Sequence, residues 1–241
     1  MHKLLFLLGF LISALGASSL DAVDHFSGSN IHVIKSKKKQ KKKPQENMSD
    51  STDYFKGKFP PNDHRAPTFR KCFELLEARN AKILVETGTA RDGAKNCGGD
   101  GCSTVLFAEW ARDHGAALYS VDICPKAIKE SKRAVTSINP HVHFATQDSV
   151  GFLRDFHQRI DFLYLDSYDF DSNNPTPSQK HHLHEIQAAL PYLHKDSVIM
   201  IDDCALPHGG KGKLVIEYLT SLGWQVLMAS YQAILVYTPP T

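Results

Sequence analysis

The sequence lacks the glycine-rich phosphate loops of nucleotide enzymes and the paired cysteines of zinc sites. No apolar strand is followed by three closely spaced glycines, and no P-loop lysine motif occurs. Its five cysteines are odd in number and show no CxxC spacing, so neither a structural zinc site nor a disulfide framework is expected. Cys97 and Cys102 lie close enough in sequence to pair in an oxidising compartment, but free thiols in a loop are the favoured interpretation.

The sequence has an excess of basic residues only near its N-terminus. Residues 1–47 hold eight lysines and three acidic residues, so 20 basic and 23 acidic residues remain of the chain's 28 and 26. The part that follows is therefore mildly acidic and shows no interleaved basic and aromatic residues, as a nucleic-acid surface would. We expect no nucleic-acid partner.

The first 52 residues differ in composition from the rest. Residues 1–17 carry Lys3 and an apolar stretch, which is typical of a signal peptide or a short membrane anchor. Residues 18–52 contain a lysine run that is expected to form a solvated linker and could associate with a membrane surface. The folded domain is predicted over residues 53–241.

The localisation depends on how this segment is used. Cleavage would secrete the domain, whereas an uncleaved anchor followed by lysines would keep it facing the cytoplasm. If Met48 is the true start, the protein is cytoplasmic. The sequence leaves these alternatives open.

From Thr68 onward, apolar runs of strand length alternate with helical patterns. This order predicts a Rossmann-like α/β fold with a mostly parallel sheet, helices on both faces and a C-terminal antiparallel hairpin. Seven strands are expected, at residues 82–86, 117–122, 141–146, 160–166, 197–202, 225–229 and 233–237. Six helices are expected, at residues 68–79, 103–113, 125–138, 149–156, 178–193 and 213–222, with Ser178 as a candidate cap.

Two consecutive strands end in residues that suit a bound nucleoside. Glu86, Gly88 and Thr89 follow the first apolar run, and Asp122 ends the next. A glycine lets the backbone approach a ligand closely, and a carboxylate at a strand tip can accept from both ribose hydroxyls. An acidic Glu86 facing the ligand would repel phosphate but tolerate a sulfonium group.

With these residues the chain resembles the class I S-adenosylmethionine-dependent methyltransferases, and methyltransferase family 24 in particular. The resemblance implies a seven-stranded sheet and S-adenosylmethionine as cofactor. It also implies that Gln147 and Asp148 lie in the segment that binds adenine, although Asp148 is equally suited to cap the following helix. The expected reaction is methyl transfer to a hydroxyl of a small-molecule or glycan-type acceptor.

Three more carboxylates follow the fourth and fifth expected strands. Asp166, Asp202 and Asp203 could converge on a hard cation such as Mg²⁺. This pattern resembles the catechol-type and macrolide-type O-methyltransferases, in which the metal orients the substrate hydroxyl. The catechol family has a lysine three residues after its first acid, where this chain has Asp169.

The missing lysine leaves the general base open. Asp166, His182 and His208 are the catalytic candidates, because histidine titrates near neutral pH and both histidines lie close in sequence to the acids. Segment 91–101 is long and could form a lid over the methionine end of the cofactor or be mobile surface, and segment 169–175 could form a loop that faces the substrate. Lys211 could meet an anionic substrate or be an ordinary solvated lysine.

Two other functions remain open at this point. A hydroxylase that shares this fold would use the same acid-rich metal site. A membrane-surface module would dock its lysine run on anionic lipid and bind the cofactor without turnover. The fold alone does not discriminate among methyl transfer, hydroxylation and membrane binding.

Overall fold

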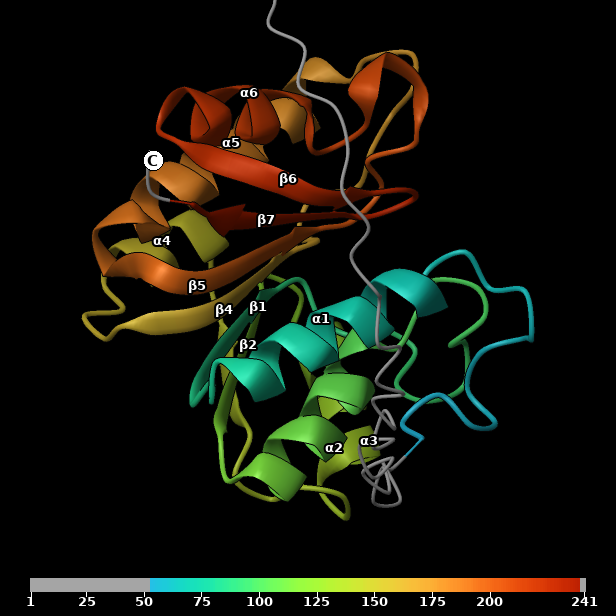
Figure 1. The fold of residues 1–241 in the computed structure, drawn as a ribbon. Coiled ribbons are helices and arrows are strands. Elements are labelled where there is room, and N and C mark those ends of the chain that lie inside the picture. The colour runs from blue at the N-terminus through green and yellow to red at the C-terminus, as the bar shows by residue number, and fades with distance from the viewer. Residues whose placement is uncertain (1–52, 239–241) are drawn as a thin grey trace, which may run out of the picture. The chain divides into compact units, whose positions relative to one another are not determined.

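The computed structural model describes residues 53–238 as a seven-stranded sheet between two layers of helices (Figure 1). The predictions for residues 1–17 and 18–52 lie outside the described residues. The strands are β1 (Ile83–Thr87), β2 (Ala117–Asp122), β3 (His143–Thr146), β4 (Ile160–Leu165), β5 (Leu193–Ile201), β6 (Trp224–Ala229) and β7 (Ala233–Tyr237). The helices are α1 (Ala66–Ala78), α2 (Ser103–His114), α3 (Pro125–Val135), α4 (Ser149–Arg154), α5 (Thr176–Ala189) and α6 (Lys213–Ser221), with 3₁₀ turns η1 (Leu190–Tyr192) and η2 (Pro207–Gly209).

The strand order confirms the predicted Rossmann-like fold. The sheet runs β3-β2-β1-β4-β5-β7-β6, and only β7 pairs antiparallel, with β5 and with β6. The chain reverses its direction of winding between β1 and β4, which are neighbours in the sheet. In open α/β sheets this switch point, at the carboxyl ends of the strands, is where ligands bind.

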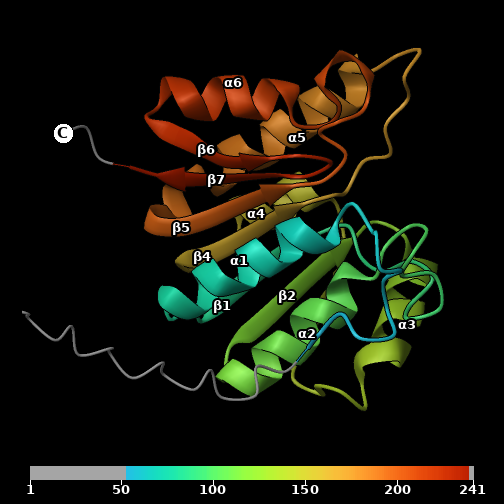
Figure 2. The same ribbon diagram turned by 45° about the vertical axis from the view of Figure 1, so that its right-hand side comes forward.

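Each face of the sheet carries its own apolar core. Helices α1, α2 and α3 pack on one face, and α4, α5 and α6 pack on the other (Figures 1 and 2). Along β4, Phe162 and Tyr164 belong to the first core, while Leu163 and Leu165 belong to the second. This strict alternation explains why the central strands appear in the sequence as continuous apolar runs.

Three local predictions need correction. Strand β5 begins at Leu193 rather than residue 197, because Leu193 pairs with Ile160 before an irregularity in the register. Helix α5 begins at Thr176, so Ser178 is no cap: it lies inside the first turn and donates to the Tyr168 carbonyl. Cys97 and Cys102 form a disulfide and are not free thiols.

Among residues 53–238, no helix is both long and apolar enough to cross a membrane.

Candidate active site

Glu86 points into the protein and not toward a ligand. Its carboxylate is fully buried and accepts hydrogen bonds from the hydroxyls of Thr104 (2.7 Å), Ser120 (2.8 Å) and Ser103. Burial raises the pKa of Glu86 to about 7, although the three hydroxyls oppose this shift by stabilising the charged form. The expectation that Glu86 faces the ligand is therefore wrong, since its oxygens hold α2 against β1 and β2.

Gly88 brings the ends of β1 and β4 into close contact. Its backbone has φ +80°, and a Cβ atom there would lie 2.4 Å from the carbonyl oxygen of Asp166. Any other residue would push the two strand ends apart. Gly88 and Thr89 line a narrow cleft at this point, and its volume is about 20 Å³.

The cleft also contains a polar group that the sequence did not single out. The hydroxyl of Ser167 is buried and has no hydrogen-bond partner among the described residues. It lines the cleft together with Asp122 and Ser103. Because buried polar groups are nearly always hydrogen-bonded in a functional state, Ser167 is a candidate ligand contact.

An open shelf adjoins the cleft at the ends of β2 and β3. Asp122 accepts a hydrogen bond from the Cys124 amide (2.7 Å), and the Gln147 amide donates to the Asp122 carbonyl (3.1 Å). Asp148 caps α4 through the Gly151 amide (2.8 Å), as the sequence suggested. Ile123 lies between these polar residues with 73% of its surface exposed, an apolar group to which a flat ring can pack.

A larger hollow of about 480 Å³ lies over the ends of β4 and β5, and we call it the acceptor hollow. It shares Arg91, Asp100 and Asp166 with the narrow cleft, so these three residues lie between the two spaces. The other residues that line it are Arg65, Gly99, Asp169, Phe170, Asp202, Asp203, Leu206, Lys211 and Tyr231. Its wall is thus rich in charged side chains of both signs.

The three predicted metal ligands do lie together, but protein cations occupy their oxygens. Lys211 Nζ is 2.6 Å from Asp166 Oδ1 and 3.1 Å from Asp203 Oδ2, and Arg65 Nε is 3.8 Å from Asp202 Oδ2. Within residues 53–238, no group of histidine, cysteine and acidic side chains has the arrangement of a metal site. The donor set therefore does not fit Mg²⁺, because Lys211 and Arg65 already pair with these carboxylates.

These ion pairs shift the ionisation of the groups involved. Burial alone would lower the pKa of Lys211, but Asp166, Asp203 and Asp202 together raise it, so the lysine stays charged. Burial raises the pKa of Asp166 well above its usual range, against the opposing effect of Lys211. Lys211 is thus no solvated lysine: 2% of its side chain is exposed.

The loop between β1 and α2 closes over both spaces. The Cys97–Cys102 disulfide fixes its second half, and Arg65 donates to the Gly99 carbonyl (3.0 Å) from the opposite side of the acceptor hollow. The guanidinium of Arg65 also lies 4.9 Å from the centre of the Tyr231 ring. The loop is therefore held down and contributes Asp100 to the site.

Comparisons with known proteins agree with this geometry. Residues 96–204 match a family model described as a methyltransferase domain. No curated protein matches the chain.

Solved structures share the fold at low identity. The SAH-bound methyltransferase PaMTH1 of Podospora anserina is 14% identical over 69% of this chain and 76% of its own, with a TM-score of 0.50. NSun6 of Pyrococcus horikoshii with SFG is 12% identical over 70% and 51%, with a TM-score of 0.53. The O-methyltransferase NovP is 16% identical over 73% and 80%, with a TM-score of 0.51.

The described residues therefore have the fold of methyltransferases, and residues 96–204 resemble a methyltransferase domain in sequence. The predicted fold is confirmed, and the match over residues 96–204 supports the predicted family resemblance and enzyme class.

The two candidate histidines lie away from both spaces. His182 is fully buried in α5, where its Nδ1 lies 2.7 Å from the Ser178 carbonyl oxygen. Burial lowers its pKa to about 4, so it is neutral at physiological pH. His208 is exposed in η2, and neither histidine lines the cleft or the acceptor hollow. We therefore leave both out of the proposed mechanism.

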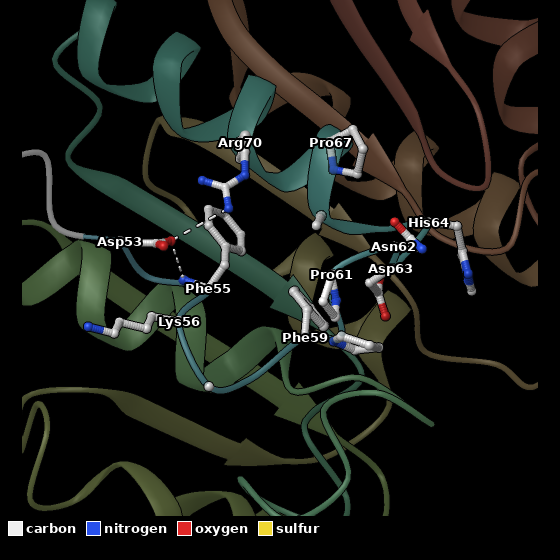
Figure 3. Close-up of a pocket in the computed structure, with 13 residues that line it drawn as sticks. Asp53, Phe55, Lys56, Phe59, Pro61, Asn62, Asp63, His64, Pro67 and Arg70 are labelled. Carbon is white, nitrogen blue, oxygen red and sulfur yellow. Dashed lines mark hydrogen bonds and ion pairs between the residues drawn. The ribbon is translucent and has the colours of Figure 1, made fainter.

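The described residues form another hollow of about 670 Å³, lined by residues between Asp53 and Arg70 (Figure 3). Arg70 stacks over Phe55 at 4.4 Å and pairs with Asp53 at 3.6 Å, so its charged groups are engaged. None of the strand ends at the switch point lines it. Size alone does not make it the active site.

Proposed function

We propose that the domain transfers a methyl group from S-adenosylmethionine to a hydroxyl of a small-molecule or glycan acceptor in the acceptor hollow. The observation that carries this proposal is the shared wall: Asp166, Arg91 and Asp100 line both the narrow cleft and the acceptor hollow. Methyl transfer is a direct displacement, so donor and acceptor must lie within contact distance. The narrow cleft and the acceptor hollow adjoin at Asp166, so a donor in one and an acceptor in the other would lie in contact.

The cofactor site spans the shelf and the cleft. Asp122 is suited to the ribose hydroxyls, Ile123 to the face of the base, and Gln147 or Asp148 to its exocyclic amine. Gly88, Thr89 and Ser167 would surround the methionine end. Because the cleft holds only about 20 Å³, the loop over residues 91–101 must move outward to admit that end.

Asp166 is the candidate base. When bound, S-adenosylmethionine supplies a methyl group on a positively charged sulfur. Lys211 engages one oxygen of Asp166, and the other accepts no hydrogen bond from the described residues. That oxygen can take the acceptor's proton as the new oxygen–methyl bond forms and the carbon–sulfur bond breaks, leaving its electron pair on sulfur.

The lining of the acceptor hollow favours an acceptor with several hydroxyls. Five aspartates, two arginines and Lys211 line it, and carboxylate and guanidinium groups bind vicinal hydroxyls well. Phe170 adds a ring face for the apolar side of a sugar. A simple phenol would leave most of these polar groups without a partner. The hydroxylase alternative needs the same acids as a metal site, and no described residue favours the membrane module.

The first test is calorimetric titration of the full chain with S-adenosylhomocysteine. Wild type should bind in the micromolar range, and Asp122→Ala should bind at least about tenfold more weakly. Asp155→Ala, at the exposed acid that follows α4, should match wild type. Absence of binding to wild type would overturn the proposal.

The second test is turnover with a panel of sugars and phenols. Asp166→Asn should keep S-adenosylhomocysteine binding and lose at least about a hundredfold in rate. Full activity in this variant would remove Asp166 as the base, and activity restricted to phenols would overturn the acceptor class.

A further inference from the structure

Three carboxylates at the ends of two neighbouring strands need compensating positive charge. Asp166 follows β4, and Asp202 and Asp203 follow β5. Burying such a cluster without cations would cost several kcal/mol for each uncompensated charge. Among residues 53–238, two cationic side chains form ion pairs with them, Lys211 and Arg65, and together these carry the charge of one divalent ion.

Each carboxylate oxygen except the second oxygen of Asp166 faces a donor or a cation. Lys211 takes one oxygen each from Asp166 and Asp203, and the Tyr231 hydroxyl donates to the other oxygen of Asp203. Asp202 accepts from the Asp203 amide (2.9 Å) with one oxygen and faces Arg65 with the other. A divalent ion requires several oxygens that point to one free centre, and this centre is filled.

The turn that carries Lys211 is built to place it there. Gln179 donates to the carbonyls of His208 (3.1 Å) and Gly210 (3.0 Å), so α5 holds the turn from outside. At Gly210, φ is +55°, and a Cβ atom would lie 1.7 Å from the Asp203 carbonyl oxygen. The turn therefore packs backbone to backbone on Asp203, which fixes the position from which the Lys211 side chain extends.

We propose that the Lys211 ammonium is the resident cation of this site, in the place where a divalent metal would otherwise bind. It acts as a positioning residue: it fixes Asp166 and Asp203 at the wall between the cleft and the acceptor hollow. Its action on the acceptor through Asp166 rests on the proposed function, whereas the assignment of the cation does not.

The consequence is that removing the ammonium opens a metal site. Lys211→Met keeps the length and apolar stem of the side chain and leaves Asp166, Asp202 and Asp203 to face a common space. The full chain, stripped with EDTA, would be titrated with Mn²⁺ and free ion followed by electron paramagnetic resonance. Lys213→Met, at the exposed lysine two residues on, is the matched control.

We expect wild type and Lys213→Met to bind no Mn²⁺ at this site, and Lys211→Met to bind one ion at least about tenfold more tightly. Adding Asp203→Asn to Lys211→Met should abolish the gain. Mn²⁺ binding by wild type that Asp203→Asn removes would overturn the proposal. So would a folded Lys211→Met protein that gains no binding.

If Lys211→Met does not fold alone, it is refolded with and without Mn²⁺ and followed by circular dichroism. Folding that depends on Mn²⁺ supports the proposal, because the ion replaces the lost charge, and failure in both conditions overturns it. None of these measurements uses an acceptor or turnover, so their failure is distinct from failure of the proposed methyl transfer.

Discussion

At the residue scale, both the fold and the proposed cofactor site depend on the absence of a Cβ atom at Gly88. Gly88→Ala adds a Cβ atom 2.4 Å from the Asp166 carbonyl oxygen, at φ +80°. We expect a loss of about 2–4 kcal/mol in the free energy of unfolding and at least about tenfold weaker S-adenosylhomocysteine binding. Urea unfolding and calorimetry measure both.

Gly115→Ala is the matched control. Gly115 also has positive φ, +58°, but a Cβ atom there meets nothing within 4 Å. It should lose only about 1 kcal/mol and keep its binding. Equal losses in the two variants would mean that backbone strain, and not the contact with Asp166, sets the effect.

Glu86 predicts a specific dependence of stability on pH. Its folded pKa of about 7 lies above its ordinary value of 4.5, so the folded state holds the proton more tightly than the unfolded state. The resulting stabilisation, about 3 kcal/mol, is complete below pH 4.5 and is lost as pH rises through 7. Glu86→Gln should remove this dependence.

Melting temperatures at pH 5 and pH 8 provide the measurement. The melting temperature of wild type should fall relative to that of Glu86→Gln across this interval, whereas Glu217→Gln, at an exposed glutamate on α6, should follow wild type. Parallel curves for wild type and Glu86→Gln would show that Glu86 is ionised throughout.

Single residues also show what the sequence could predict of the site. That Asp166, Asp202 and Asp203 meet follows from strand order alone, since carboxyl ends of parallel neighbours share an edge. The direction of the Glu86 side chain does not follow from strand order, because it depends on three hydroxyls from α2 and β2. Lys211 reaches Asp166 across 45 positions, and its only local signal was a basic residue within a glycine-rich turn.

At the scale of elements, the loop between β1 and α2 connects cofactor and acceptor. The Cys97–Cys102 disulfide closes its second half, which contributes Asp100 and Gly101 to the cleft. Opening the disulfide by the double variant Cys97→Ser/Cys102→Ser should loosen these residues. We expect S-adenosylhomocysteine binding about tenfold weaker, since the loop must then be ordered on binding.

Calorimetry with and without dithiothreitol measures this effect. Wild type under reducing conditions should match the double variant, and Cys124→Ser, at an exposed free cysteine before α3, should bind like oxidised wild type. Unchanged affinity on reduction would show that Arg65 alone holds the loop.

Most elements were predictable because their signals are local. The residue ranges of β2 and β7 were predicted without error, and α2, α3, α4 and α6 start where expected, since Pro125 and Ser103 mark changes in apolar period. The start of β5 was missed because His194, Lys195 and Asp196 interrupt its apolar run, and pairing with β4 extends the strand through them. Tertiary pairing overrides local composition there.

At the scale of the whole molecule, one sheet serves two cores, and each core contains one of the chain's two tryptophans. Trp110 lies in the core beneath α1 and α2, and Trp224 lies in the core of α5 and α6. Both are nearly buried, with 1% and 6% of their surfaces exposed. Trp110→Phe and Trp224→Phe thus give single reporters for opposite faces of the sheet.

We expect both reporters to show the same urea transition within experimental error. Residues of β4 alternate between the two cores. If one helical layer unfolds, one face of the sheet is exposed to water and the strands that support the other layer are destabilised. Each variant's circular dichroism at 222 nm controls for the stability cost of its own substitution. Saturating S-adenosylhomocysteine should move both transitions equally, because its site at the switch point joins strands that carry both cores. If the Trp224 fluorescence of a variant changes at lower urea than its circular dichroism, the layer of α5 and α6 opens first. If the ligand shifts only the Trp110 transition, the stabilising contacts of the cofactor lie on the face of α1 and α2 alone.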